Sequence, residues 1–337
     1  MHFEKNGRPT IRDVAREAGV SYQTVSRVIN NHPKVAAITR ERVQHIIDQM
    51  GYQKNHAAEM LRTHRTHIIQ VIVVDGKFPF ELPLLDAANF GDYYAVYAEC
   101  TAETLAQSLA TAAARMIEGI FLYAPKLTIS DEDLVEISCG LPIVRRDFAP
   151  DSMMSWVGFD QVAATRLAVQ HLIELGHHHI AEVTGSLVTL NVALRHQIWE
   201  QTLLEHGLTP GPSVMGDYTT SKIAIESGYE GMCEILKRGE LFTAVMVAND
   251  HMATGVIHAL HQQGLRIPDD VSIVSFDNAP HARFLNPPLT TIKFDFDRQN
   301  RLAFRCLFEM IHNRDSKPQQ HTLMPELIVR ESTRRVG

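Results

Sequence analysis

The sequence predicts a small all-α head with a helix-turn-helix, followed by an α/β body of two lobes with parallel sheets. Charge divides the 337 residues in the same way. Residues 1–65 contain 11 Lys and Arg against 6 Asp and Glu, a net charge of +5, while residues 66–337 carry a net charge of −12. Three short helical patterns occupy the basic part, and apolar runs alternate with helical patterns in the acidic part. A basic head on an acidic body suggests a nucleic-acid-binding module.

The overall composition is that of a globular protein. The net charge of −7 would argue against a nucleic-acid partner only if the charge were evenly spread. No apolar stretch reaches the roughly 18 residues of a membrane span, and the first ten residues lack the apolar run of a secretory signal. The four cysteines (Cys100, Cys139, Cys233 and Cys306) are far apart and show no metal-like spacing. We expect a cytoplasmic protein with reduced thiols, no metal, no cofactor and no membrane partner.

The first predicted helix spans residues 11–18. Its apolar residues recur at helical spacing, Thr10 is a good N-cap with Asp13 three residues on, and Gly19 ends the helix.

The second predicted helix, residues 22–29, is capped by Ser21 after a tight turn. Two helices joined in this way, with a third packed behind them, form a helix-turn-helix. The spacing alone fits a solvated helix pair in any all-α domain equally well. The outward side chains suit a major groove, because Gln can pair with adenine, Arg with guanine, and Tyr and Ser with phosphates or bases. The predicted base contacts are Tyr22, Gln23, Ser26 and Arg27.

The third predicted helix opens at Thr39 and is closed by Gly51. We place the head at residues 1–50 and a linker with a further short helix at residues 51–66. Hydroxyl and amide side chains in and around these helices are of the right type to hold phosphates. The predicted phosphate contacts are Thr10, Ser21, Thr24, Asn30, Thr39 and Asn55.

Two series of apolar runs predict the strands of the body, with helices such as 161–175 and 251–263 between them. A break near residues 159–160 predicts two lobes. Sheets of this kind bind ligands outside the carboxyl ends of their strands, where several polar residues fall. The predicted strands are 68–75, 95–100, 120–124, 143–147, 180–185, 214–218, 245–250, 271–277 and 323–330.

The head motif resembles a known family. Thr10 to Asn30 read TIxDVAxxAGVSxxTVSRVIN, which is similar to the head of the lac repressor family of bacterial transcription regulators. Residues 21–27 resemble the recognition helix of the protein after which the family is named. The resemblance implies that Tyr22, Gln23 and Arg27 read the bases of a palindromic operator.

Residues 55–64 resemble the family's hinge helix, which folds on the operator and enters the minor groove. Leu61 would be the apolar wedge that unstacks a base step. Without the resemblance, Leu61 would more often be an ordinary interface leucine. Lys54 and His56 stand where the family commonly has Pro and Arg, which affects the entry geometry and one minor-groove contact.

The resemblance extends over nearly the whole chain, through the segments 158–160, 171–177, 247–253 and 288–292. These are similar to the family's effector-binding core, which resembles periplasmic sugar-binding proteins and has three crossovers between its lobes. The resemblance implies that the chain returns to the first lobe near residues 289–296 and finishes in the second. The expected lobes are 67–160 with 290–320, and 161–289 with 321–337.

A sugar-like effector held between the lobes is the ligand that the resemblance implies. Carboxylates accept hydroxyl hydrogens, Arg and Asn bridge ring oxygens, and an aromatic ring covers the apolar face of a sugar. Tyr218 replaces a stacking Trp of the family. The expected effector-binding residues are Asp147, Asn191, Arg195, Tyr218, Asn249 and Asp277.

Two segments depart from the family pattern. Residues 75–94 are Pro-rich and shorter than usual, and their Phe78 and Phe80 either line the crevice or merely pack. Arg145 and Arg146 stand where apolar residues are common. Arg146 would then favour an anionic sugar, or the two arginines form a surface or interlobe ion pair.

Three other sequence patterns bear on metal binding, catalysis and oligomeric state. Consecutive residues of a strand point to opposite sides, so the run 177–179 of three histidines predicts no metal site. No phosphate-binding glycine loop or nucleophile motif predicts an enzyme. The chain shows no heptad-patterned tail after its last predicted strand, so we expect a homodimer, which also suits two heads on a palindrome.

We therefore predict a dimeric, sequence-specific DNA-binding repressor of carbohydrate-utilisation genes. A small sugar-like effector would release it from a double-stranded operator. Within the same family, a purine or a phosphorylated sugar acting as co-repressor is the alternative, and a purine would favour extra aromatic residues in the crevice. A stand-alone sugar-binding protein would need an export signal and would lack the head.

Overall fold

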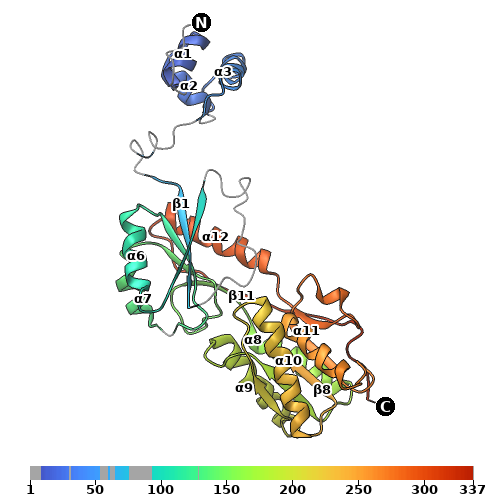
Figure 1. Cartoon of the computed structure of the whole chain (residues 1–337). Coiled ribbons are helices and arrows are strands. Elements are labelled where there is room, and N and C mark those ends of the chain that lie inside the picture. The colour runs from blue at the N-terminus through green and yellow to red at the C-terminus, as the bar shows by residue number, and fades with distance from the viewer. Residues whose placement is uncertain are drawn as a thin grey trace. The chain divides into compact units, whose positions relative to one another are not determined.

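The computed structural model describes residues 9–29, 32–53, 60, 65–75, 93–127 and 129–336. Contacts divide the chain between Thr66 and His67 into two compact units, a head and a body (Figure 1). In the described part, no helix has the length and apolar character needed to span a bilayer. The expected hinge helix with Asn55 and Leu61, the phosphate contact Asn30, and Phe78 and Phe80 lie outside the described residues.

The head contains three helices in its described part, α1 (Ile11–Ala18), α2 (Tyr22–Ile29) and α3 (Ala37–Met50). The predicted cap of α1 is confirmed. The Thr10 hydroxyl accepts the Asp13 N–H, and the Asp13 carboxylate accepts the Thr10 N–H at 3.0 Å. Gly19 ends α1 with φ of 63°, in the left-handed region that glycine adopts without strain.

A compact core joins the three helices, with Val14, Val25 and Val43 fully buried. The predicted start of the third helix was two residues late. Helix α3 begins at Ala37 after Ala36, which offers no side-chain cap, and Thr39 is its third residue. Hydroxyl residues are common at helix starts, which favoured Thr39, but here the helix begins two residues earlier without a side-chain cap.

Lobe 1 is built on a parallel sheet in the order β11-β5-β4-β3-β1-β2. Alternate residues of its strands face opposite sides. Ile72, Leu122 and Ile143 pack under α6 and α7, whereas Phe121 and Val144 pack against α12 on the other face (Figure 1). The elements are β1 (Ile68–Val74), β2 (Tyr94–Cys100), α6 (Leu105–Ala114), β3 (Gly119–Tyr123), α7 (Asp131–Ile137), β4 (Ile143–Arg145), β5 (Ser155–Phe159), α12 (Phe296–His312) and β11 (Gln320–Leu323).

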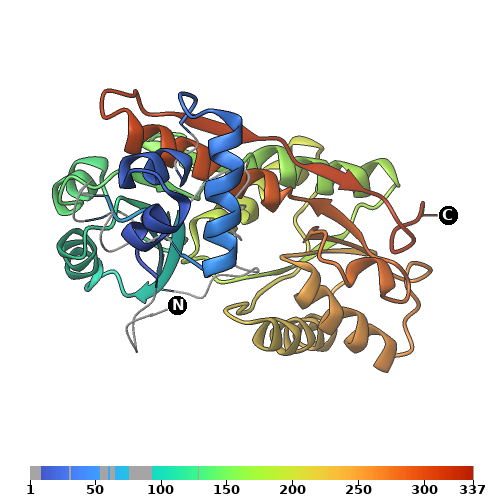
Figure 2. The same ribbon diagram turned by 90° about the horizontal axis from the view of Figure 1, so that it is seen from above.

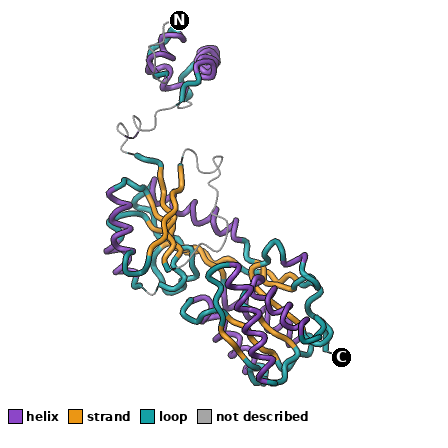
Figure 3. Tube along the Cα trace, viewed as in Figure 1, coloured by secondary structure: helices purple, strands orange, loops and turns teal. Residues whose placement is uncertain are grey.

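Lobe 2 is likewise built of helices packed around a sheet (Figures 2 and 3). Its strand order is β12-β10-β9-β8-β6-β7, and only β12 runs antiparallel to its neighbour. Helices α8 and α9 contribute to the core on one face of the sheet, and α10 and α11 to the core on the other. The elements are α8 (Gln161–Glu174), β6 (Ile180–Thr184), α9 (Leu190–Glu205), β7 (Ser213–Met215), α10 (Ser221–Arg238), β8 (Ala244–Val247), α11 (Asp250–Gln262), β9 (Ser272–Asp277), a 3₁₀ turn (Ala282–Phe284), β10 (Thr290–Lys293) and β12 (Glu326–Ile328).

The crossover back to lobe 1 lies within the predicted range 289–296, but the lobe boundary that we set at residue 290 comes one strand too early. Strand β10 pairs in parallel with β9 of lobe 2, and the chain enters lobe 1 only after Lys293. The last predicted strand, 323–330, merges two strands of different sheets, because β11 pairs with β5 in lobe 1 and β12 with β10 in lobe 2. Met324 and Pro325 separate them. The interlobe crossovers of the described chain therefore lie at residue 160, at residues 294–295 and at residues 324–325.

Candidate functional site

The outer face of α2 carries the predicted base-reading residues. Tyr22 is 57% exposed, and Gln23 and Arg27 are also exposed, while Val25 is fully buried. Ser26 is half-buried on the flank of the helix, so the predicted set divides into exposed and partly covered members.

The starts of α1 and α2 carry two of the predicted phosphate-contact residues at exposed positions, Thr10 and Ser21. Helix N-termini favour anions, because their first N–H groups and the helix dipole point outward. Thr24 is half-buried, and its hydroxyl lies 3.0 Å from that of Ser21. Thr39 lies half-buried within the first turn of α3. Both hydroxyls are less open to a phosphate than Thr10 and Ser21.

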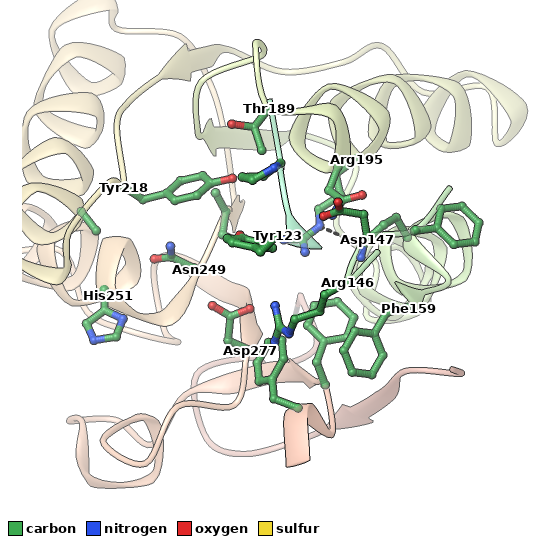
Figure 4. A pocket seen from close by; sticks show the side chains of 18 of the residues that line it. Tyr123, Arg146, Asp147, Phe159, Thr189, Arg195, Tyr218, Asn249, His251 and Asp277 are labelled. Atoms are coloured by element: carbon green, nitrogen blue, oxygen red, sulfur yellow. Dashed lines mark hydrogen bonds between the residues drawn. The ribbon is translucent and has the colours of Figure 1, made fainter. Parts of the chain in front are cut away.

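A cavity of about 320 Å³ lies in the body, with walls from both lobes. Its volume is within the range of small-molecule sites. The structure brings all the expected effector-binding residues to its wall (Figure 4), most of them just beyond the carboxyl ends of strands, as parallel sheets predict. They are Asp147, Asn191, Arg195, Tyr218, Asn249 and Asp277.

Asp147 follows β4 and is 6% exposed. Neither oxygen of its carboxylate has a hydrogen-bond partner among the described residues. Burial raises the pKa of this carboxyl, and the charges of Arg145 and Arg146 act in the opposite direction. An ionised group in this state has lost its water without gaining hydrogen bonds, which is costly unless a ligand supplies them.

Asp277 ends β9 with φ of 101°, an unusual conformation for a residue with a side chain. Burial raises the pKa of its carboxyl to about 7, with Arg195 acting against the rise. The buried Asp250 anchors the neighbouring backbone, because its carboxylate accepts the Ala279 N–H at 2.6 Å and the Thr291 hydroxyl at 2.8 Å. The strained position of Asp277 is thus fixed by the strands around it.

Arg195 projects from α9 into the cavity. Its Nε donates to Gln161 Oε1 at 2.7 Å, and its Nη1 donates to the Ala248 carbonyl at 3.1 Å. The guanidinium also lies over the rings of Phe276 and Phe294, 4.4 and 5.2 Å from their centroids. Burial lowers the pKa of Arg195, whereas Asp277 raises it. Two hydrogen bonds and two ring faces thus orient the guanidinium.

Asn249 and Tyr218 come from the loops after β8 and β7. The Asn249 carbonyl oxygen accepts the Met252 N–H at 2.8 Å and caps α11, which turns its amide nitrogen to the cavity (Figure 4). The Tyr218 ring lies against Gly185, where a Cβ would come within 2.1 Å of the ring. Gly185 therefore makes room for the aromatic wall.

Several residues of the wall were not predicted. Aromatic side chains form a larger part of it than expected, and Phe159 packs against Phe294 and Phe296 with centroids 4.7 and 5.5 Å apart. The strand-end rule could have found Tyr123, which ends β3. The additional aromatic residues are Tyr123, Phe148, Phe159, Phe294 and Phe296, and the additional polar ones include Gln161, Thr189, Thr219, Thr220, Ser221, His251 and Gln299.

The two consecutive arginines point to different places. Arg145 lies away from the cavity, with its Nη1 4.0 Å from Asp131 Oδ1. Arg146 lines the cavity, where its Nε donates to Asn300 Oδ1 at 3.0 Å and its guanidinium lies between the rings of Tyr123 and Phe296. The second arginine, not the pair, belongs to the site.

The histidine run has a structural role at its first residue. His177 Nδ1 lies 2.9 Å from the Thr243 hydroxyl, and its Nε2 lies 3.1 Å from the Arg334 carbonyl. These contacts tie the end of α8 to the C-terminal segment. In the part of the chain that the structure covers, no three His, Cys, Asp or Glu side chains group as metal ligands would.

Comparison with known proteins decides the family. Residues 10–55 match the model of bacterial regulatory proteins of the lacI family, and residues 169–333 match a periplasmic binding protein-like domain. The HTH-type transcriptional repressor PurR of Haemophilus influenzae (strain PittEE) is 33% identical over 336 residues, which are 97% of this chain and 99% of the relative. The chain belongs to the lacI family.

Other lacI-family proteins are similar over the same length. PurR of Pasteurella multocida (strain Pm70) is 32% identical over 96% of this chain and 98% of its own. The lac repressor dimer bound to operator and the anti-inducer ONPF has a TM-score of 0.80 at 29% identity, covering 97% of this chain and 100% of that one. The regulator CelR in complex with cellobiose has a TM-score of 0.67 at 27% identity, with 96% and 100% covered. The lacI family consists of cytoplasmic DNA-binding transcription regulators, not enzymes.

Proposed function

We propose that this lacI-family regulator is a dimeric repressor that binds a palindromic operator and is released by a small, neutral, sugar-like effector in the body cavity. The observation that carries the effector proposal is Asp147, a buried carboxylate on the cavity wall whose two oxygens lack hydrogen-bond partners. A ligand with adjacent hydroxyl groups would donate to both oxygens. Carboxylates and hydroxyls pair well in this way, and the desolvation of Asp147 would then be compensated.

Charge balance in the cavity favours a neutral ligand. Arg146 and Arg195 supply two positive charges, and Asp147 and Asp277 on the same wall offset both of them above pH 7, where Asp277 is ionised. An anionic sugar would need a positive excess to offset its own desolvation. The hydroxyl and amide groups of the wall, with Tyr218 on one side, suit a polyol with one apolar face.

The proposal of operator binding rests on the head. Its second helix presents Tyr22, Gln23 and Arg27 outward over a core of valines, and the solved lac repressor complex contains a dimer on its operator. We infer that two copies of this chain bind two half-sites of a palindrome. Exchange of Gln23 or Arg27 for Ala should cost about 1–3 kcal/mol at one base position and relax specificity there. Equal weakening on every sequence would show that these residues contact phosphates only.

A purine-like co-repressor is the second candidate, because the cavity wall has more aromatic surface than the sequence predicted. Tyr123 and Tyr218 are available as stacking partners for a planar ring, with the phenylalanine cluster beside them. Flat heteroaromatic ligands gain from such stacking. The cavity wall therefore offers groups that suit a sugar and groups that suit a purine, and a binding experiment must distinguish the two ligand classes.

Thermal unfolding of the full-length protein with sugars, sugar phosphates, nucleobases and nucleosides separates the candidates. A ligand at 100 times its dissociation constant adds about 2.7 kcal/mol of stability. We expect a neutral sugar to raise the unfolding temperature and to weaken operator binding in a mobility-shift assay. Stabilisation by a nucleobase with tighter operator binding would support the second candidate, and stabilisation by sugar phosphates alone would contradict the neutral ligand.

A further inference from the structure

Arg195 is held by residues that stand where the chain crosses between the lobes. Gln161, its partner at 2.7 Å, is the first residue after the crossover at residue 160. Phe294, whose ring lies 5.2 Å from the guanidinium, is in the crossover at residues 294–295. A residue of the cavity wall thus contacts two of the segments about which the lobes would rotate.

These crossovers are also tied to one another. The Asp160 N–H donates to the Leu323 carbonyl at 3.0 Å, which joins the first crossover to the strand that leads into the third. Phe159, just before the first crossover, packs against Phe294 of the second with centroids 4.7 Å apart. A change in lobe angle would therefore alter all of these contacts together.

Gln161 has a specific place in this arrangement. It is 3% exposed, and its carbonyl oxygen accepts the Arg195 Nε–H. Without that acceptor, the described contacts of Arg195 are the Ala248 carbonyl and two ring faces, which orient a planar guanidinium less strictly than a second hydrogen bond does.

We propose that Gln161 is a positioning residue that couples Arg195 in the effector cavity to the interlobe crossovers. A ligand shifts a conformational equilibrium only when its free energy of binding differs between the two states. Gln161 begins α8 directly after the first crossover, and Phe294 lies in the second, so a rotation that bends these segments would change how Arg195 is held. A ligand that contacts Arg195 then binds the two angles with different affinity. The inference rests on the proposed function in that one point, the contact between the effector and Arg195.

The first experiment needs no effector. In the full-length protein, spin labels are attached to the exposed Cys139 of lobe 1 and to a cysteine introduced at the exposed Leu204 of lobe 2, with Cys100 and Cys233 replaced by Ser. The distribution of label distances is measured by pulsed electron spin resonance. We expect Gln161→Leu to broaden or shift the distribution. Gln161→Glu, which keeps the acceptor, should preserve it.

The matched control is Gln201→Leu, the same exchange at an exposed position of α9, which should also preserve the distribution. An unchanged distribution in Gln161→Leu would overturn the proposal, and so would an equal change in Gln161→Glu.

The second experiment uses the ligand that the thermal screen identifies. Its readout is the factor by which a saturating concentration changes the affinity for operator DNA. Coupling of this kind commonly amounts to about 5–150-fold, and we expect Gln161→Leu to reduce the factor at least about fivefold. A variant that binds the ligand more weakly but keeps the full factor at saturation would contradict the proposal. If no compound in the screen binds the unmodified protein, the proposed effector site fails, and the distance measurement still decides the role of Gln161.

Discussion

At the scale of single residues, the cavity is built from side chains whose positions are unfavourable for the unliganded protein. Asp147 is buried without hydrogen bonds, and Asp277 holds a left-handed backbone conformation. Both features lower the stability of the fold, and both lie in the cavity where we propose that the ligand binds. Strain and unpaired polarity of this kind concentrate at functional sites.

Asp147→Asn tests whether this carboxylate serves a ligand. The exchange removes a buried charge, so the unfolding temperature at neutral pH should stay the same or rise, because burial raises the pKa of the carboxyl and disfavours its ionised form. Affinity for the effector should fall by about 1.5–3 kcal/mol, since charged hydrogen bonds to hydroxyls are lost. Calorimetric titration and thermal unfolding measure the two effects. A clear loss of stability with unchanged affinity would assign Asp147 to the fold instead.

Asp277 predicts a dependence of effector binding on pH. Burial raises the pKa of its carboxyl to about 7, from an ordinary value of 3.8. The ionised form therefore appears in the folded protein only as pH rises through 7, and the protein loses stability between the two values because the unfolded chain ionises first. If the effector donates to the carboxylate, its affinity should increase from pH 6 to pH 8. Asp277→Asn should flatten that profile, and a wild-type profile that is already flat would count against the contact.

At the scale of elements, the sequence predicts the type and order of most helices and strands but not their partners. Strand β10 has only four residues, TTIK, which fit either sheet, and its pairing with β9 places it in lobe 2. Strand β5 was missed although every residue in it is buried, because Ser155 and Gly158 interrupt the apolar run in its five residues. Short strands are specified by long-range contacts that a local pattern does not contain.

The candidate site was predicted in the same uneven way. Polar strand ends and the family resemblance located Asp147, Asn249 and Asp277, since a parallel sheet brings such ends to one edge. Phe294 and Phe296 escaped prediction because they follow a strand whose lobe was misassigned. Gln161 was not predicted, because the sequence at the start of a helix does not show which distant side chain a residue there will contact.

Helices α10 and α11 pack closely at two glycines, Gly228 of α10 and Gly255 of α11. A Cβ at Gly255 would lie 2.0 Å from the Ile225 carbonyl oxygen and 2.5 Å from the Tyr229 nitrogen, both backbone atoms of α10. Gly255→Ala should therefore lower the free energy of unfolding by about 1–3 kcal/mol or more, despite the better helix propensity of alanine. Gly231→Ala in α10 is the milder comparison, because its Cβ would meet no backbone atom and only the side chains of Val183 at 3.1 Å and Val214 at 3.6 Å. Equal denaturant midpoints for the two variants would contradict the prediction, because they would show that α10 and α11 can move apart to accommodate the Cβ at residue 255.

At the scale of the whole molecule, the two units have opposite charge, and this division explains a net charge of −7 in a DNA-binding protein. The head and the linker together, residues 1–66, carry +5, and the body, residues 67–337, carries −12. When Lys and Arg side chains bind DNA phosphates, the cations condensed on the DNA are released, which makes binding strongly dependent on salt concentration. The acidic body should be repelled by the duplex, which would leave contact with DNA to the head and the linker.

Removal of residues 1–66 tests this division of labour, because contacts separate the chain at that point. The body alone, residues 67–337, should lose operator and non-specific DNA binding at all salt concentrations, since its remaining net charge is negative. It should keep the effector affinity of the full chain, because every residue of the cavity wall lies beyond residue 120. Fluorescence anisotropy with labelled DNA and calorimetry with the effector measure the two properties on one preparation. DNA binding retained by the body would place part of the interface outside the head, whereas loss of effector binding with intact folding would show that the cavity depends on the head.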